Sequence, residues 1–441
     1  MKRSKIKISV IGLWHQGIVT AACLSEAGYN VIGIDSDSKI IKNLNSTITP
    51  VFEPGLDLIL AKQIKKKRLT FRNNFSLIKN ADLIILAHDT QIKNNDEIKL
   101  KKVHDDIQNI IPHLRPKQVL HVTSQVPVGT CNFISNVINK KIKFFNNIAY
   151  TPENLRLGQA IYRYKNPSLP IIGVSNNYTF NYLKKIYKIF SDDWKKTDLK
   201  TAEITKHGLN TFLAMSITYA NEIGNLCDKL GIDGHEVGKL LKIEPRIGRF
   251  AMLRPGMGFA GGTLARDVKT LINLSKNLSI KTPLINSIMI SNVMQNNLPI
   301  KILKKIFKNK LQGKKVLVLG LTYKSNTSTL RRSVSLQIIK KLISNKVKVS
   351  SYDPMASRFE IAKHKFLNFH ENIFDAVKNI DAIIVTTPWN NFLNLDLKKI
   401  KNLMKNNIFV DICGLFNGSE VIKKGFDFYS IGNNSSFRKI I

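Results

Sequence analysis

Ile8-Ser-Val-Ile-Gly12-Leu-Trp14-His15-Gln16-Gly17 is the stretch of this chain that decides its fold. An apolar run typical of a buried strand ends at Gly12, a helical segment follows, and a second strand ends at Asp35. A strand, a glycine turn, a helix and a carboxylate roughly 20 residues further on are typical of a dinucleotide-binding βαβ unit. The fingerprint is incomplete, because Trp14 stands where G-x-G-x-x-G has its middle glycine.

The turn predicts a role for each of its residues. Gly12 permits the tight turn and Gly17 permits close packing of helix on strand, so that the helix N-terminus faces a pyrophosphate. Asp35 would accept hydrogen bonds from the adenosine ribose, which favours NAD over NADP. Trp14 could turn its indole away and leave its backbone amide in place; the alternative is a unit that has lost tight dinucleotide binding. The expected cofactor is NAD, and the expected cofactor-binding residues are Gly12, Trp14, His15, Gln16, Gly17, Asp35 and Ser124.

Length and composition bound the class of protein. The chain has 441 residues, enough for two or three domains, and no apolar run approaches the roughly 18 residues that a membrane span needs. The N-terminus leads directly into the first strand, which leaves no room for a signal peptide. The four cysteines are widely separated, so we expect neither a metal cluster nor a disulfide framework. These features predict a cytoplasmic protein without membrane contact.

The net charge of +37 raises the possibility of nucleic-acid binding. The lysines are dispersed, however, and their local runs lack the interleaved aromatic residues on which bases would stack. We therefore expect no nucleic-acid partner. A basic surface would still attract a polyanionic ligand such as a nucleotide diphosphate.

Strand and helix patterns alternate in two regions, separated by a helical one. They predict an α/β protein with two Rossmann-like doubly wound domains joined by a central long-helix domain. The long helix is expected from Asp198 to about Leu241, because helical periodicity runs there without proline. The expected domains are 1–197 for NAD, 198–308 for dimerisation and the substrate loop, and 309–441 for a UDP-sugar. The expected strands are residues 7–11, 30–35, 81–88, 118–124, 147–152, 170–174, 315–320, 347–353, 381–387 and 407–411.

Seven short motifs follow one another along essentially the whole chain. They are Glu53-Pro-Gly-Leu56, Val126-Pro-Val-Gly-Thr130, Thr151-Pro-Glu153-Asn-Leu-Arg156-Leu-Gly-Gln-Ala160, Ala202-Glu-x-x-Lys206-x-x-x-Asn210, Arg246-Ile-Gly248, Pro255-Gly-Met-Gly-Phe-Ala-Gly-Gly262, and Gly320-Leu-Thr-Tyr-Lys324 leading to Arg331-Arg-Ser333. In this order the chain resembles the UDP-glucose/GDP-mannose dehydrogenase family. Any one motif is weak, but seven in order are very specific.

The resemblance implies oxidation of the C6 alcohol of a nucleotide sugar with NAD in a homodimer. It identifies Glu153 with the family's general acid/base, Lys206 with its oxyanion-stabilising lysine, and Asn210 with the neighbouring amide. Asp267 matches the aspartate that closes the substrate loop. The residues expected to bind a UDP-sugar are Leu155, Arg156, Lys206, Asn210, Gly258, Phe259, Gly262, Lys324 and Arg331.

The loop that carries the family's nucleophile departs from the pattern. The family reads G-G-S-C-F-P-K-D, whereas this chain has Thr263-Leu-Ala-Arg266-Asp267 after its two glycines. The cysteine is absent, Thr263 is the nearest hydroxyl, and Arg266 replaces a lysine. Threonine is a far weaker nucleophile than a thiolate, so residue type excludes a thioester route. Because the residues for alcohol oxidation remain, we expect one oxidation to the aldehyde, or two through a non-covalent hydrate.

Two other functions stay open. Trp14 and the missing cysteine favour a catalytically silent nucleotide-sugar-binding protein, whereas the presence of Glu153, Lys206, Asn210 and Asp267 together opposes it. The second alternative, nucleic-acid binding, depends on charge alone. The sequence decides neither the sugar nor the base, although UDP is favoured.

Overall fold

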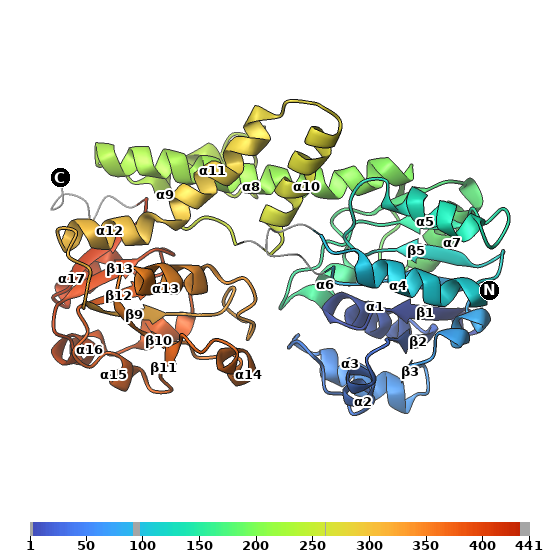
Figure 1. The fold of residues 1–441 in the computed structure, drawn as a ribbon, viewed down its shortest axis with the longest axis horizontal. Helices are drawn as coiled ribbons and strands as arrows, with labels where there is room; N and C mark the ends of the chain where they lie inside the picture. The colour runs from blue at the N-terminus through green and yellow to red at the C-terminus, as the bar shows by residue number, and fades with distance from the viewer. Residues whose placement is uncertain (1–2, 91–97, 261, 433–441) are drawn as a thin grey trace. The chain divides into compact units, whose positions relative to one another are not determined.

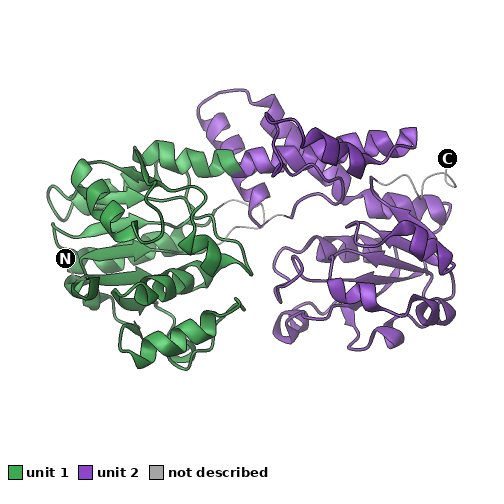
Figure 2. Ribbon diagram, turned by 180° about the vertical axis from the view of Figure 1, so that it is seen from behind, with its two compact units in different colours: residues 1–209 green, residues 210–441 purple. Residues whose placement is uncertain are grey.

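The structure is a computed structural model that describes residues 3–90, 98–260 and 262–432. The chain divides into two compact units, Met1–Leu209 and Asn210–Ile441 (Figure 2). The boundary falls inside one long helix, α8 (Leu199–Leu230), which contributes turns to both units.

The first unit is built on an eight-stranded sheet with the order β3-β2-β1-β4-β5-β6-β7-β8 (Figure 1). The pairs are parallel except β6 with β7, which is antiparallel. The strands are β1 (Lys7–Ile11), β2 (Asn30–Ile34), β3 (Leu69–Arg72), β4 (Leu83–Leu86), β5 (Val119–Val122), β6 (Ile148–Tyr150), β7 (Ile171–Val174) and β8 (Lys195–Thr197). The chain order reverses between β1 and β4, and ligands bind at such a switch point in open α/β sheets.

Helices cover both faces of this sheet, because the strands bury apolar side chains on both sides. In β1, Val10 belongs to the core beneath α1, α3 and α7, whereas Ile11 belongs to the core beneath α4 and α5. Alternation of side chains along a strand explains the division. The helices are α1 (His15–Glu26), α2 (Ser38–Asn45), α3 (Leu56–Lys65), α4 (Lys101–Ile110), α5 (Thr130–Asn139), α6 (Ala160–Lys165) and α7 (Asn177–Tyr187).

The long helix is confirmed but is shorter than expected. It ends at Leu230, because Gly231 adopts φ +72° and the Ile232 amide turns back to the Cys227 carbonyl at 2.9 Å. Asp233 then caps a new helix by accepting hydrogen bonds from the amides of His235 and Glu236. The helices that follow α8 are α9 (Gly234–Leu241), α10 (Leu264–Asn277), α11 (Pro283–Asn296) and α12 (Leu298–Ile306).

The second unit ends in a parallel six-stranded sheet with the order β11-β10-β9-β12-β13-β14. Its strands are β9 (Lys315–Leu319), β10 (Lys348–Tyr352), β11 (Asn368–Phe369), β12 (Ala382–Val385), β13 (Ile408–Asp411) and β14 (Asp427–Ser430). Its helices are α13 (Val334–Ser344), α14 (Arg358–Ala362), α15 (Ile373–Ala376), α16 (Leu397–Leu403) and α17 (Gly418–Lys423). The strand order repeats that of the first unit, so the expected fold class with two Rossmann-like sheets and a long central helix is confirmed.

Four strands were not expected: β3, β8, β11 and β14. Within the described residues, no helix is both long enough and apolar enough to cross a bilayer.

Candidate active site and cofactor turn

At two positions of the first βα turn, Gly12 and Gly17, a side chain larger than that of glycine does not fit. Gly12 has φ +90°, and a Cβ there would lie 2.4 Å from Nδ1 of His88. A Cβ on Gly17 would lie 1.8 Å from the Gly12 carbonyl oxygen. The first and last glycines therefore form the tight turn and the close helix–strand contact that a dinucleotide site requires.

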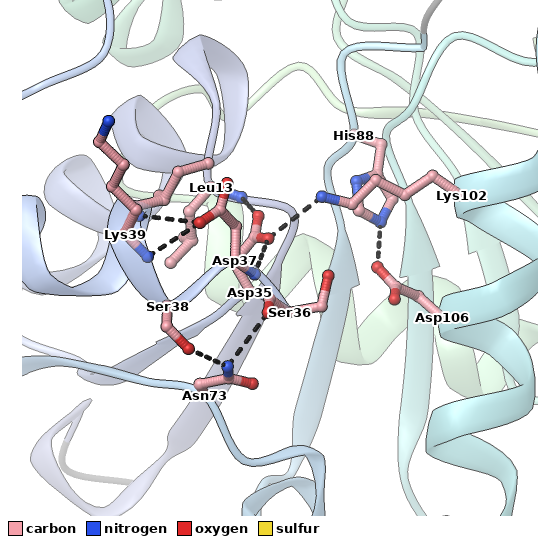
Figure 3. Close-up of polar contacts among 11 residues, drawn as sticks. Leu13, Asp35, Ser36, Asp37, Ser38, Lys39, Asn73, His88, Lys102 and Asp106 are labelled. Carbon is pink, nitrogen blue, oxygen red and sulfur yellow. Dashed lines mark hydrogen bonds and ion pairs between the residues drawn. The ribbon is translucent and has the colours of Figure 1, made fainter.

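Asp35 lies directly after β2 and is 2% exposed. One carboxylate oxygen accepts the Leu13 amide at 2.8 Å, and the other accepts the Asp37 amide at 3.0 Å and Nζ of Lys102 at 3.1 Å (Figure 3). Burial alone would raise the pKa of Asp35, but the two amides and the Lys102 ammonium bring it below its usual range. Asp35 is therefore an anion that holds the turn and meets a cation at the nucleotide edge.

Trp14 is the residue before α1 and has ordinary extended backbone angles, φ −97° and ψ −158°. Its side chain is 38% exposed, so the indole does not fill the core. The first turn of α1 already has hydrogen-bond partners. The Gln16 amide donates to Asp89 at 3.2 Å, and Nε2 of Gln16 donates to the Thr123 carbonyl at 2.7 Å. The glycine cradle, the helix N-terminus and the strand-end carboxylate fit NAD, although Asp89 would have to yield one amide to a phosphate.

His15 connects this turn to the loop after β6. Its Nε2 lies 2.9 Å from Glu53, a 3% exposed carboxylate that also accepts the amides of Gly158 and Ala160 at 2.8 and 2.7 Å. Burial would raise the pKa of Glu53, but His15 and the two amides lower it. The structure thus gives His15 a structural partner; its expected contact with the cofactor stays a prediction.

Glu153 and Lys206 interact electrostatically within the first unit. Burial is the main cause that raises the pKa of Glu153 and Asp89 adds to it, whereas the Lys206 ammonium opposes both. The Glu153 carboxylate accepts the Leu155 amide, and Lys206 is 3% exposed. Glu153 is half-buried, and a carboxyl with a raised pKa beside a buried ammonium is typical of a proton-transfer site.

A cavity of about 80 Å³ lies beside Glu153. Gln16, Thr123 and Leu155 contribute to its wall, together with aromatic residues such as Tyr187 and Trp194. Burial lowers the pKa of His121, another wall residue, to about 3, so its imidazole is neutral. Arg156, by contrast, is exposed.

The first turns of α8 are tied to the loop after β5. Glu203 accepts the amides of Gly129 and Cys131 at 2.5 and 2.8 Å, and His207 contacts the Val126 carbonyl at 2.9 Å. Ser124, expected to bind cofactor, is fully buried in this loop. Its hydroxyl accepts the His88 amide at 2.6 Å and donates to the Leu86 carbonyl at 3.1 Å, so the structure shows it joining two strand ends.

In the second unit the structure brings Asn210 and Asp267 together. The Asn210 side-chain amide donates to the Asp267 carboxylate, and both residues are buried. Arg266 adds charge, since its Nε lies 3.9 Å from the other Asp267 oxygen. Lys206 and Asn210 stand four positions apart on α8, one helical turn.

Thr263 directly precedes α10 and has a partner that the sequence did not indicate. The Tyr323 phenol is hydrogen-bonded to it; burial raises the pKa of Tyr323, whereas Thr263 and Arg266 oppose the rise. The base needed to make a threonine nucleophilic is not supplied by a neutral phenol. A Cβ on Gly262 would lie 3.7 Å from Cδ of Arg332, which is ordinary contact.

Polar side chains hold the glycine-rich loop in place. Asn292 on α11 accepts the Phe259 amide at 2.7 Å and donates to the Phe259 carbonyl at 3.1 Å. A Cβ on Gly258 would lie 2.4 Å from that asparagine oxygen, so the clamp requires glycine. Asn221 accepts the Gly256 amide at 2.8 Å. The part of the loop from Gly256 to Phe259 is therefore held in place within its own unit.

The turn after β9 contains the expected Lys324 and leads to Arg331. Gly320 has φ +93°, and Asp353 after β10 accepts the amides of Leu321 and Thr322 at 2.6 and 3.0 Å. Lys324 is partly buried and Arg331 is exposed. Their expected contacts with a UDP-sugar stay predictions.

The four cysteines are free thiols, and their environments disfavour the thiolate. Burial raises the pKa of Cys23 to about 12, and it also raises the pKa of the other three, Cys131, Cys227 and Cys413. None lies in the loop of residues 255–267.

Sequence reasoning missed Lys102, Asp89, Glu53 and Tyr323 as members of these sites. Glu53 belongs to a recognised motif that could have drawn attention to it. Tyr323 likewise lies inside the recognised motif from Gly320 to Lys324. No local signal marks Lys102 or Asp89, because each meets its partner only through the fold.

Relatives with assigned activities resemble the chain over nearly its whole length. A UDP-glucose 6-dehydrogenase of Rickettsia bellii (strain RML369-C) is 33% identical over 436 residues, covering 97% of this chain and 100% of that protein. A UDP-glucose 6-dehydrogenase of Bacillus subtilis (strain 168) is 31% identical and covers 98% of each.

Solved structures share the fold. A UDP-glucose dehydrogenase from the hyperthermophilic archaeon Pyrobaculum islandicum superimposes with a TM-score of 0.85 at 25% identity, over 92% of this chain and 94% of that one. A UDP-D-ManNAc dehydrogenase from Pyrococcus horikoshii gives 0.87 at 24% identity, over 98% and 100%.

Three parts of one family's description match in sequence. The NAD binding domain of the UDP-glucose/GDP-mannose dehydrogenase family matches residues 6–191, its central domain residues 200–294, and its UDP binding domain residues 317–418. The cofactor turn described above lies in the first of these. The chain therefore belongs to the UDP-glucose/GDP-mannose dehydrogenase family and is an NAD-dependent oxidoreductase that acts on CH–OH donors.

Proposed function

We propose that this protein oxidises the C6 alcohol of a UDP-sugar resembling UDP-glucose, without a cysteine thioester step. The observation that carries the proposal is the half-buried Glu153 carboxyl, with its raised pKa, beside the buried Lys206 ammonium at the switch-point end of the first sheet. A UDP binding domain in the family match and UDP-glucose 6-dehydrogenase relatives support the choice of substrate.

The chemistry assigned to these residues is alcohol oxidation. NAD, when bound, supplies the hydride acceptor. Glu153 takes the proton of the C6 hydroxyl, directly or through a water, and its raised pKa suits a base that works near neutrality. Lys206 stabilises the oxygen as negative charge develops on it. Asp267 fixes the side-chain amide of Asn210, so that its carbonyl oxygen can accept from a hydroxyl.

The second oxidation is the finer part of the proposal. Thr263 is paired with the Tyr323 phenol, and all four thiols have raised pKa values, so no activated nucleophile is available among the described residues. The protein then stops at the aldehyde or oxidises an aldehyde hydrate without a covalent intermediate.

The deciding experiment is NADH production from UDP-glucose and a panel of UDP- and GDP-sugars, with NADH counted per sugar and intact-protein mass measured during turnover. One or two NADH per sugar with an unmodified protein mass is expected. A trapped acyl-enzyme overturns the cysteine-free route. Thr263→Ala is expected to keep NADH production, and Lys206→Met to lower kcat about 10²–10³-fold; the exposed Lys200→Met is the matched control on α8.

A nucleotide-sugar-binding protein without activity is the second candidate, and Trp14 in place of the middle glycine favours it. Calorimetry separates the two candidates. Binding of UDP-glucose without NADH from any sugar of the panel would favour the silent protein.

Two further assignments complete the proposal. The three domains are residues 1–197, 198–308 and 309–441, and the protein is a homodimer that uses the long helix α8. Light scattering coupled to size exclusion measures the oligomeric state directly, and a monomer at assay concentration contradicts the second assignment.

A further inference from the structure

Glu53 is a buried carboxylate that joins segments far apart in the sequence. Its Oε2 lies 2.9 Å from Nε2 of His15 and accepts the Gly158 amide at 2.8 Å, and its Oε1 accepts the Ala160 amide at 2.7 Å. His15 is the first residue of α1, directly after the cofactor turn. Gly158 belongs to the loop after β6 (residues 151–159), which also carries Glu153, and Ala160 begins α6. One side chain thus connects the cofactor turn to the loop that carries the proposed base.

The protonation states of this contact follow from its geometry. Burial alone would raise the pKa of Glu53, but the His15 ring and the two amides lower it, so the side chain is a carboxylate at neutral pH. An ionised carboxylate only accepts hydrogen bonds, so Nε2 of His15 carries a proton and donates it. All three contacts are therefore donations to one anion, and loss of its charge would weaken them together.

Neighbouring structure fixes both ends of the contact. The Glu53 carbonyl accepts the Leu56 amide at 3.1 Å where α3 begins, and Leu56 belongs to the same core as the apolar residues of α1. At the other end, Gln159 is the N-cap of α6 but makes no side-chain hydrogen bond to that helix. The Glu53 anion satisfies the first amide of α6 instead. The turn of α1 and the loop after β6 therefore share one buried hydrogen-bond acceptor.

We propose that Glu53 is a positioning residue that couples the cofactor turn to the loop after β6, so that NAD binding orders this loop and strengthens the binding of the UDP-sugar. A first ligand that orders a segment lowers the entropic cost for the second, and such coupling is reciprocal. The sugar part of the inference rests on the proposed function, whereas the ordering of the loop by NAD does not.

The first test needs no sugar. Hydrogen–deuterium exchange of the full chain is measured by mass spectrometry in peptides that cover residues 154–162, with and without NAD. In the unmodified protein, NAD should slow exchange there about tenfold. In Glu53→Gln the effect should disappear, because a side-chain amide presents a single acceptor oxygen to three donors. His15→Phe should also remove it, and His15→Gln, which keeps an N–H donor, should restore it.

Calorimetry then measures the coupling to the sugar nucleotide. NADH replaces NAD in this experiment, because NADH and UDP-glucose form a complex without oxidation of the alcohol. Saturating UDP-glucose should tighten NADH binding about five- to tenfold in the unmodified protein and by a factor of about one in Glu53→Gln.

Glu203→Gln is the matched control. Glu203 is also buried and accepts the amides of Gly129 and Cys131 where α5 begins, but it does not contact the cofactor turn. We expect this variant to lose stability and to keep the effect of NAD on residues 154–162. Exchange that NAD does not slow in the unmodified protein overturns the inference, and so does equal slowing in Glu53→Gln. If NAD slows exchange only with Glu53 present but UDP-glucose does not bind, the coupling of turn and loop stands and the proposed substrate fails.

Discussion

The first βα turns of the two sheets share one backbone conformation, but they differ in the chain that follows the turn. After β1 and after β9 a glycine with φ near +90° turns the chain, and the next amide donates to an aspartate at the end of the adjacent strand. In the first unit the helix begins at once, at His15. In the second it begins only at Val334, after a segment that includes Lys324 and Arg331.

The two aspartates show what this difference means. One oxygen of Asp353 accepts the Leu321 amide, the Thr322 amide and hydroxyl, and the Trp389 indole N–H, all within 3.2 Å. One oxygen of Asp35 accepts the Leu13 amide, and the other meets the Lys102 ammonium as well as an amide. The strand-end carboxylate first holds the turn, and only its unused acceptor capacity is available to a ligand.

Glu153→Gln is expected to have the largest effect, because it removes the proposed base at a strand end of the first sheet. We expect kcat to fall about 10²–10⁴-fold. The pKa of Glu153 is raised and the base acts when deprotonated, so in the unmodified protein the rate should rise with pH through that raised pKa and stay high above it. The pH profile of kcat measures this.

The control is Asp411, the strand-end carboxylate after β13 in the second sheet. It accepts the amides of Gly414 and Phe416 at 2.9 and 2.8 Å and therefore holds a turn. Asp411→Asn should lower stability and leave the rising limb of the profile in place. If the rising part of the pH profile of kcat shifts in Asp411→Asn but not in Glu153→Gln, the proposed base does not lie at the strand ends of the first sheet.

Gly17→Ala tests the close contact between the start of α1 and the Gly12 carbonyl in the first turn. Its Cβ would meet the Gly12 carbonyl at 1.8 Å, so we expect a loss of about 3 kcal/mol in the free energy of unfolding and a weaker NAD affinity. Denaturant unfolding and NAD titration measure both. Gly208→Ala on α8 meets nothing within 4 Å and should stabilise by about 0.5–1 kcal/mol; equal losses in both variants would contradict the steric argument.

Asp353→Asn separates holding a turn from binding a ligand. The substitution weakens hydrogen bonds to a buried anion, so we expect unfolding to become easier by about 2 kcal/mol while NAD affinity stays unchanged. Asp35→Asn should affect both quantities. NAD titration of the two variants compares them, and a change of NAD affinity in Asp353→Asn would show that the two turns are not independent.

Trp14→Gly should have the smallest effect. The backbone at Trp14 is extended, so glycine is not needed for its conformation, and the exposed indole contributes little to the core. We expect NAD to bind a few-fold more tightly, roughly two- to fivefold, because the backbone can approach the pyrophosphate. Titration with NAD measures it, and a much weaker affinity would instead assign the indole to the cofactor contact.

Periodicity in the sequence predicted the interior strands but not those near the sheet edges. The expected strand at residues 7–11 is β1, because a strand buried on both faces is apolar throughout. β8 has the sequence Lys-Lys-Thr and is largely exposed, so only its pairing with β7 identifies it as a strand. The long helix was expected to continue past Gly231, where a single glycine gives no certain stop.

Local motifs likewise predicted part of the site. Asn210 and Asp267 were both expected, and the structure adds that one donates to the other. Lys102 could not be foreseen, because nothing near it in sequence distinguishes it among 68 lysines and arginines. Its pairing with Asp35, 67 residues away, is a product of the sheet order that brings β4 beside β1.

The buried thiols bear on how this enzyme withstands oxidative stress. Peroxides and alkylating agents attack thiolates, and a cysteine whose pKa is raised holds few of them near neutral pH. All four thiols here are of that kind. Turnover should therefore survive treatment with iodoacetamide or mild peroxide, conditions that would inactivate an enzyme dependent on a thiolate nucleophile.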